Sequence, residues 1–217
     1  MRVRPISPSA LVEEIADAAV ARLAATGARW LRIVVDGPPP AEPGRLAAAL
    51  VDPLRVRGRA ALQVRADDFL RPASLRLEHG RTNPDAYYED WLDVAGLRRE
   101  ALDPLGAAGS GRVLPALWNA ATDRAARVDY VALPPGGVLL VSGAMLLGTG
   151  LPFDLAVHLA MSAAALARRT DADLAWTLPA YRRYAEEVGP VGLADIVVRC
   201  DDPRHPAIAL TSVANGP

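Results

Sequence analysis

The sequence predicts an α/β fold in which a mostly parallel sheet carries helices on both faces. Short apolar runs such as Leu31 to Val35 and Val138 to Val141 are bounded by turn residues, which is typical of buried parallel strands. Segments of helical composition separate these runs, and alternating strands and helices favour a parallel sheet covered on two sides. With 217 residues, of which 51% are hydrophobic, the chain suits one folded domain spanning residues 1–217.

The first part of the chain predicts two helices and two strands. Within the N-terminal segment 1–28, Ser9 and Gly27 bracket a helix over residues 10–25, because these residue types favour the two ends of a helix. The strand at 31–35 leads to a helix starting at Arg45. This helix should end near Asp52-Pro53, because a residue before proline is disfavoured in the helical conformation. Residues 60–64 form the next strand.

The second part of the chain opens with an excursion at residues 71–130, where polar, aromatic and acidic residues mix without a clear period. We expect a helix from about Trp91 to Ala101 inside it, and an irregular or β-hairpin region over residues 112–129. The remaining expected elements are strands at residues 138–141, 155–159 and 194–199, an edge strand at 208–212, and helices at 162–169 and 179–188.

The composition excludes several classes of function. A formal net charge of -1 predicts no strong attraction to nucleic acid or to an anionic membrane. No apolar stretch reaches the ~20 residues that a membrane helix needs, and the N-terminus does not resemble a signal peptide. Cys200 is the single cysteine, which suits a cytoplasmic protein. The three histidines, His79, His158 and His205, stand in unrelated contexts, so we predict no metal site.

The stretch LRIVVDGPPPAEPGRLAAAL, residues 31–50, has the order strand, glycine loop and helix start. This order is the framework of a phosphate-binding loop, in which backbone N–H groups, a Lys and a Ser or Thr hold phosphates and Mg²⁺. The loop contains four prolines, which have no N–H to donate. The whole chain has no lysine, and no Ser or Thr lies between Gly37 and Leu50. The framework is present without its usual chemistry.

This stretch resembles the uridine kinase branch of the P-loop nucleoside kinases, where the first strand runs into D-G-P-x-A-A-G-K-T-T-L-A. Aligned without gaps, Glu42, Pro43, Gly44 and Arg45 stand where the family has Gly, Lys, Thr and Thr. With a longer loop, Gly44-Arg45 imitates Gly-Lys, but Leu46 then replaces the hydroxyl. The resemblance implies a three-layer P-loop NTPase-like fold with ATP and Mg²⁺ as family cofactors. Of that cofactor site only Gly37, Gly44 and Arg45 remain as candidates.

Two further strand ends match the family in part. Asp67-Asp68-Phe69-Leu70 resembles the D-x-F-[YH] pattern, which implies Asp67 as the general base and Phe69 in the substrate site. The alternative is that the aspartate pair only caps a strand or helix. Ser142-Gly143 stands where the family has Asp-Gly, so the carboxylate that helps to hold Mg²⁺ is replaced by a poor ligand.

The excursion and the lid supply the remaining candidates. Residues 80–105, GRTNPDAYYEDWLDVAGLRREALDPL, resemble the G-R-x-x-P-x-x-Y-Y-x-D-x-x-D stretch of the family. Residues 168–171 and 178–184 resemble the two sides of its arginine-bearing lid. The implied substrate contacts are Tyr87, Tyr88, Asp90, Asp93, Arg168, Arg169 and Arg182. The alternatives are core packing for the aromatics and solvated helix faces for the arginines.

Three hypotheses follow for the function. The first is a uridine kinase-like protein whose ATP site has decayed, leaving a regulatory or binding protein with a pocket for a nucleoside-like small molecule. The second is an active nucleoside or small-molecule kinase in which Arg45 replaces the loop lysine. The third is a structural subunit that pairs with an active paralogue or with another copy of itself.

Overall fold

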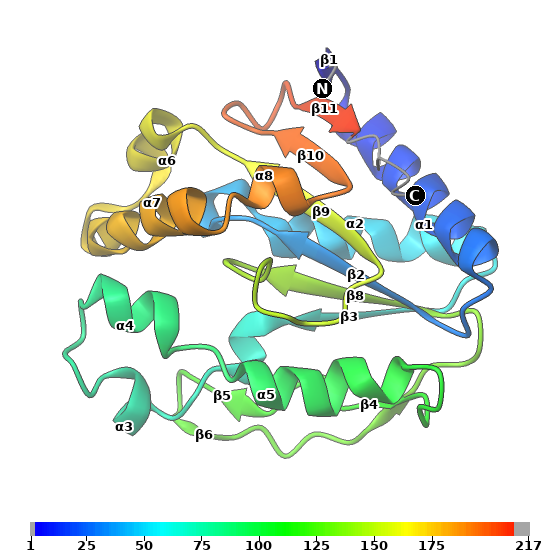
Figure 1. Ribbon diagram of the computed structural model, residues 1–217, viewed down its shortest axis with the longest axis horizontal. Coiled ribbons are helices and arrows are strands. Elements are labelled where there is room, and N and C mark those ends of the chain that lie inside the picture. Colours follow the sequence, from blue (N-terminus) through cyan, green and yellow to red (C-terminus); the bar gives the residue numbers. More distant parts are fainter. Residues whose placement is uncertain (1–2, 211–217) are drawn as a thin grey trace.

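The computed structural model describes residues 3–210, which are built around a seven-stranded sheet with the order β1-β11-β10-β9-β2-β8-β3 (Figure 1). Five neighbouring strands are parallel: β10 (Ile196–Arg199), β9 (Leu155–Ala160), β2 (Leu31–Asp36), β8 (Val138–Gly143) and β3 (Ala61–Arg65). β11 (Ala207–Leu210) and β1 (Val3–Pro5) extend the sheet in antiparallel pairing. The predicted α/β fold with a mostly parallel sheet is confirmed.

The central strands β2, β8 and β9 are mostly apolar and almost entirely buried because both faces of the sheet are covered. In β2, Val34 pairs with Val141 of β8 on one side and with Ala156 of β9 on the other, and all three side chains are buried. The expected strands at 31–35, 60–64, 138–141, 155–159 and 194–199 all lie within one or two residues of the observed ones.

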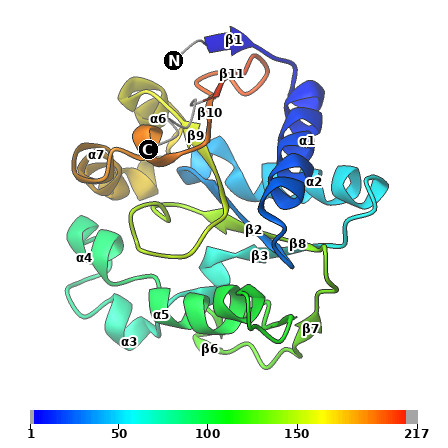
Figure 2. The same cartoon turned by 45° about the vertical axis from the view of Figure 1, so that its right-hand side comes forward.

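Two helices, α1 (Pro8–Thr26) and α2 (Pro43–Val56), lie against one face of the sheet (Figure 2). Ser7, rather than the expected Ser9, caps α1 by accepting a hydrogen bond from the Ala10 N–H, and Gly27 ends the helix in the left-handed conformation. α2 continues through Pro53, contrary to the expected end at Asp52. The extra turn buries Leu54 in the core, and this burial offsets the backbone hydrogen bond that proline cannot donate.

The other face of the sheet is covered by the segment from α5 (Val94–Leu97) into a π-helical turn (Arg98–Leu102). The helix was expected to begin at Trp91, but Asp93 is its N-cap and accepts a hydrogen bond from the Gly96 N–H. Leu97, Ala101 and Leu102 of this segment are fully buried. A short 3-10 turn (Asp103–Leu105) follows.

The excursion at 71–130 contains more regular structure than its sequence indicates. It holds two short helices, α3 (Ala73–Arg76) and α4 (Pro84–Glu89); α4 begins where Asn83 accepts hydrogen bonds from two backbone N–H groups. The expected hairpin in residues 112–129 is present as β5 (Trp118–Asn119) and β6 (Arg124–Ala125). Outside it, β4 (Arg112–Val113) pairs with β7 (Val131–Ala132).

The C-terminal part contains α6 (Ala163–Arg169), a 3-10 segment η5 (Ala172–Thr177), α7 (Leu178–Glu187) and α8 (Pro190–Leu193). The strand expected at 208–212 corresponds to β11, with residues 211 and 212 outside the described part of the chain. β11 is not the sheet edge, because β1 pairs with its outer side. In residues 3–210, no helix has the length and apolar character needed to span a membrane.

Candidate functional site

The carboxyl ends of the parallel strands point toward the side of the molecule where α4 and α7 face each other (Figure 1). β2 lies between β8 and β9, so the connections after these strands diverge there, and open α/β sheets bind ligands at such a point. Two cavities occupy this edge, one of 470 Å³ and one of 480 Å³. They share Pro39, Asp67, Tyr87 and Ala144 in their walls.

The loop after β2 lines the 480 Å³ cavity and offers almost no N–H groups to an anion. Pro38, Pro39, Pro40 and Pro43 have none. A 3-10 turn over Pro39–Ala41 uses two further N–H groups internally. The N–H of Ala41 donates to the Pro38 carbonyl at 2.8 Å, and the N–H of Glu42 donates to the Pro39 carbonyl at 2.9 Å. Between residues 38 and 46, only the Gly44 N–H has no intramolecular acceptor.

Glu42 adds a carboxylate to the loop that lines this cavity. Its backbone has φ 56° and ψ 52°, the left-handed conformation that favours glycine, so the backbone shape fits the alignment in which Glu42 replaces the family glycine. The Arg45 guanidinium donates to the Glu42 carboxylate at 3.0 Å, and 79% of the Arg45 side chain is exposed. Arg45 is therefore engaged with the carboxylate of the loop itself.

The neighbouring strand ends do not supply a metal site. Ser142 is buried, and its hydroxyl lies 3.4 Å from the amide nitrogen of Gln63, which also donates to the Gly44 carbonyl at 2.9 Å. In residues 3–210, no cluster of His, Cys, Asp and Glu is arranged to hold a metal ion. With a neutral Ser142 and the carboxylate of Glu42 beside the loop, the residues present do not fit a Mg²⁺-bound nucleoside triphosphate.

Asp67 stands between the two cavities and lines both. It lies in a 3-10 turn (Ala66–Phe69) directly after β3, and Arg65 contacts its carboxylate at 3.2 Å. The side chain is 66% exposed, so this ion pair is weak and leaves the carboxylate free to meet a ligand. Burial raises the pKa of the adjacent Asp68. The main-chain carbonyl of Asp68 accepts a hydrogen bond from the Leu117 N–H, next to the hairpin formed by β5 and β6.

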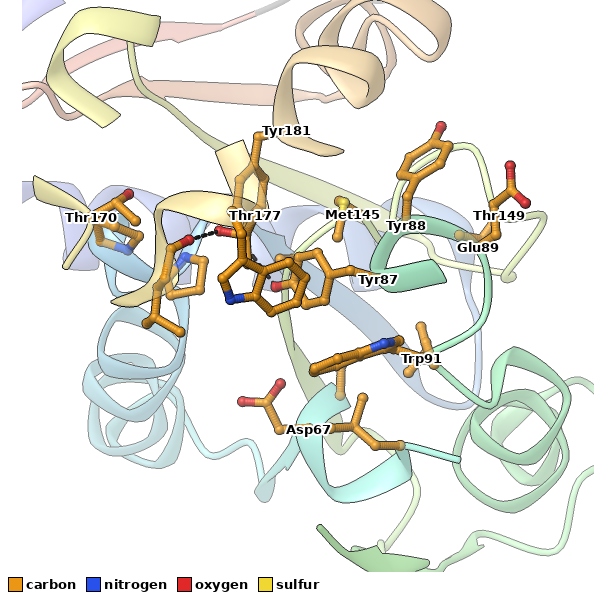
Figure 3. A pocket seen from close by; sticks show the side chains of 18 of the residues that line it. Asp67, Tyr87, Tyr88, Glu89, Trp91, Met145, Thr149, Thr170, Thr177 and Tyr181 are labelled. Carbon is orange, nitrogen blue, oxygen red and sulfur yellow. Dashed lines mark hydrogen bonds between the residues drawn. The ribbon is translucent and has the colours of Figure 1, made fainter. Parts of the chain in front are cut away.

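The 470 Å³ cavity has a cluster of aromatic rings in its wall (Figure 3). The rings come from two distant parts of the chain: α4 and the residues after it, and the segment from η5 into α7. Hydroxyl groups of Tyr87 and Tyr181 are 2.7 Å apart and join the two parts. The rings that line the cavity belong to Tyr87, Tyr88, Trp91, Trp176 and Tyr181.

Arg183 fixes α7 to α4 on the outside of this cavity. Its guanidinium contacts Asp85 at 3.2 Å and Glu89 at 2.7 Å, and it lies over the Tyr88 ring at 4.6 Å from the ring centroid. The lid-like segment and the excursion are therefore linked by an ion-pair network and by the tyrosine pair.

The structure gathers only some of the expected substrate residues around the cavity. Tyr87, Tyr88 and Arg169 line it. Phe69 is fully buried in the core cluster that includes Leu97 and Leu102, and it lines neither cavity. The others lie outside the wall: Asp90 contacts Arg71, Asp93 caps α5, and Arg168 and Arg182 are exposed.

Sequence reasoning missed three of the aromatic residues, Trp91, Trp176 and Tyr181. Trp176 lies in the short connection DADLAWT, and Tyr181 lies one turn into a helix that begins beside Pro179. The tryptophan was an available signal, because a large ring in a short connection needs an apolar surface to cover it.

A second missed feature is a buried polar network under the loop. Asp36, at the end of β2, has no exposed surface and accepts hydrogen bonds from the Leu146 N–H at 2.8 Å and the Tyr184 hydroxyl at 3.0 Å. The His158 Nδ1 atom lies 2.7 Å from the same carboxylate. Burial, followed by the charge of Asp36, raises the pKa of Tyr184. Asp36 thereby ties β2, β9, the connection after β8 and α7 together.

The sequence matches no protein-family model, and no curated protein matches it significantly. Solved structures do resemble it. A possible uridine kinase from Bacillus stearothermophilus superimposes with a TM-score of 0.64 at 21% identity, covering 85% of this chain and 98% of the other. A candidate fructose transport system kinase from Silicibacter sp. TM1040 superimposes with a TM-score of 0.59 at 18% identity, covering 81% of this chain and 94% of the other. The chain has the same fold as these two structures.

Proposed function

We propose that this protein is a uridine kinase-like member of the P-loop kinases that binds a small molecule in the aromatic cavity and does not transfer phosphate from ATP. The observation that carries the proposal is the loop after β2, where prolines and internal hydrogen bonds leave a single N–H, on Gly44, without an acceptor. The similarity to kinases of known fold supports the ancestry, and the place of Asp67 in the walls of both cavities supports the role of general base that the resemblance implies for it.

Phosphoryl transfer depends on positioned positive charge more than on covalent chemistry by the protein. The loop lacks a lysine, the Glu42 carboxylate would repel the phosphates, and Ser142 replaces a metal-binding carboxylate. Loss of one such stabilising group typically costs ~10²-fold or more in rate. Three losses together leave a transfer rate close to that of the uncatalysed reaction.

The active-kinase alternative requires Arg45 to take over the role of the loop lysine. Arg45 contacts Glu42, and its side chain points into solvent, so a phosphate would have to displace this ion pair and accept the Glu42 carboxylate as a neighbour. No contact in the described residues favours that arrangement.

A phosphoryl-transfer assay tests the proposal. Purified protein with Mg·ATP and a panel of nucleosides and sugars is expected to form no phosphorylated product above the rate of an Asp67→Asn variant. Product formation that depends on Asp67 would refute the proposal and establish the active-kinase alternative, with Arg45→Ala as the variant that then identifies the replacement for the lysine.

A further inference from the structure

We infer that the aromatic cavity takes an organic cation, a small quaternary or alkylated amine, and this inference rests on the proposed function of the same cavity as a ligand site. Ring faces are electron-rich and attract cations within about 6 Å of the ring centroid. The cavity wall combines five aromatic side chains with the carboxylates of Asp67, Glu89 and Asp171 and the guanidinium of Arg169. Arg65 and Arg183 pair with Asp67 and Glu89 from outside the wall, so within residues 3–210 Asp171 is the carboxylate of the wall without an ion-pair partner.

The geometry of the rings suits a cation better than a flat neutral molecule. Tyr87 meets Trp91, Trp176 and Tyr181 at interplanar angles of 84°, 73° and 73°, with centroids 4.9 to 6.0 Å apart. Steeply inclined rings form a corner rather than a slot between two parallel faces. A rounded alkylammonium group contacts several such faces at once, whereas a planar base stacks best on one or between two parallel ones.

The protein already places its own cations on two of these rings. The guanidinium of Arg76 lies 5.1 Å from the Trp91 centroid, and that of Arg183 lies 4.6 Å from the Tyr88 centroid. Within residues 3–210, no basic side chain lies over the rings of Tyr87, Trp176 or Tyr181. Trp176 and Tyr181 contact Tyr87 edge to face, so these three rings form one cluster that, within residues 3–210, carries no cation of the protein itself.

The charges around the three remaining rings have the matching sign. Burial raises the pKa of Tyr87, the hydrogen bond with Tyr181 lowers it, and the negative charge of Asp67 raises it. Asp171, at the start of η5, has no ion-pair partner among the described residues, whereas Glu89 is paired with Arg183. The Arg169 guanidinium donates to the Cys200 carbonyl at 3.2 Å, which ties it to the main chain.

The inference is tested with two soluble probes of the same shape that differ in charge. Choline carries a trimethylammonium group, and 3,3-dimethylbutan-1-ol carries the neutral tert-butyl group in its place. We expect calorimetry and tryptophan fluorescence to give an affinity for choline about tenfold higher than that for the alcohol. Equal affinities, or no binding of choline, would overturn the inference.

Matched variants locate the site. Asp171→Asn removes a charge from the cavity rim, and Asp173→Asn removes one from the same segment outside the cavity wall. Trp176→Leu removes a cavity ring, and Trp118→Leu removes a tryptophan from the hairpin. Choline binding should weaken several-fold in Asp171→Asn and Trp176→Leu and stay unchanged in the two controls. An equal loss in the Asp173→Asn control would contradict the assignment.

A uridine titration separates this inference from the proposed function. Tighter binding of uridine than of choline would overturn the cationic ligand class and leave the proposed function standing. Phosphoryl transfer from ATP would refute the proposed function whatever the choline result.

Discussion

Asp36→Ala is expected to lower the free energy of unfolding by about 3–5 kcal/mol. The substitution leaves the Leu146 N–H and the Tyr184 hydroxyl without their acceptor in a region with no exposed surface, and it removes the partner of His158. Each buried polar group left unpaired costs about 1–3 kcal/mol. Chemical denaturation followed by circular dichroism measures the change.

The matched control for this prediction is Asp52→Ala. The Asp52 side chain is 87% exposed and contacts only Arg55, at 3.4 Å within the same helix. Its removal is expected to change stability by less than about 0.5 kcal/mol. An Asp36→Ala variant as stable as the control would mean that the network under the loop contributes little to the fold.

Repair of the loop is expected to strengthen Mg·ATP binding by about 10²-fold or more. The repaired sequence reads G-P-A-A-A-G-K-T from Gly37 onward and recreates the phosphate-binding pattern. Glu42 already has the left-handed backbone that glycine adopts, so the exchange at this position fits the existing chain path. The substitutions are Pro39→Ala, Pro40→Ala, Glu42→Gly, Pro43→Lys and Gly44→Thr.

The size of the expected gain follows from the groups restored. Hydrogen bonds to a charged phosphate contribute about 1.5–3 kcal/mol each, and about 1.4 kcal/mol corresponds to a tenfold change in affinity. Two such bonds therefore give a gain of this order. The control carries the same substitutions except that alanine replaces Pro43. If the repaired protein binds Mg·ATP no better than this control, the loop is not what prevents nucleotide binding.

The fold could be predicted from the sequence because its signals are local. Short, mostly apolar runs bounded by turn residues located the five parallel strands, and buried strands of this kind need no information from distant residues. The predicted end of α2 was wrong because it depends on tertiary packing and not on a local signal. The local effect of Pro53 is outweighed by the burial of Leu54, which depends on how the helix packs on the sheet.

The site was predictable only where one segment defines it. The prolines and the missing lysine are visible in the sequence itself. The internal hydrogen bonds of the loop and the left-handed backbone conformation of Glu42 appear only in the structure. The aromatic cavity joins Tyr87 to Tyr181, 94 positions later in the chain, so its composition depends on the packing of α4 against α7. The burial of Phe69 likewise follows from tertiary packing.

A calorimetric titration of the unmodified protein with Mg·ATP tests the central claim most directly. With one unpaired N–H and a carboxylate in the loop, we expect no detectable heat at high protein concentration, with or without uridine. Stoichiometric binding in the micromolar range, weakened by Arg45→Ala, would contradict the claim that this loop no longer holds a nucleotide.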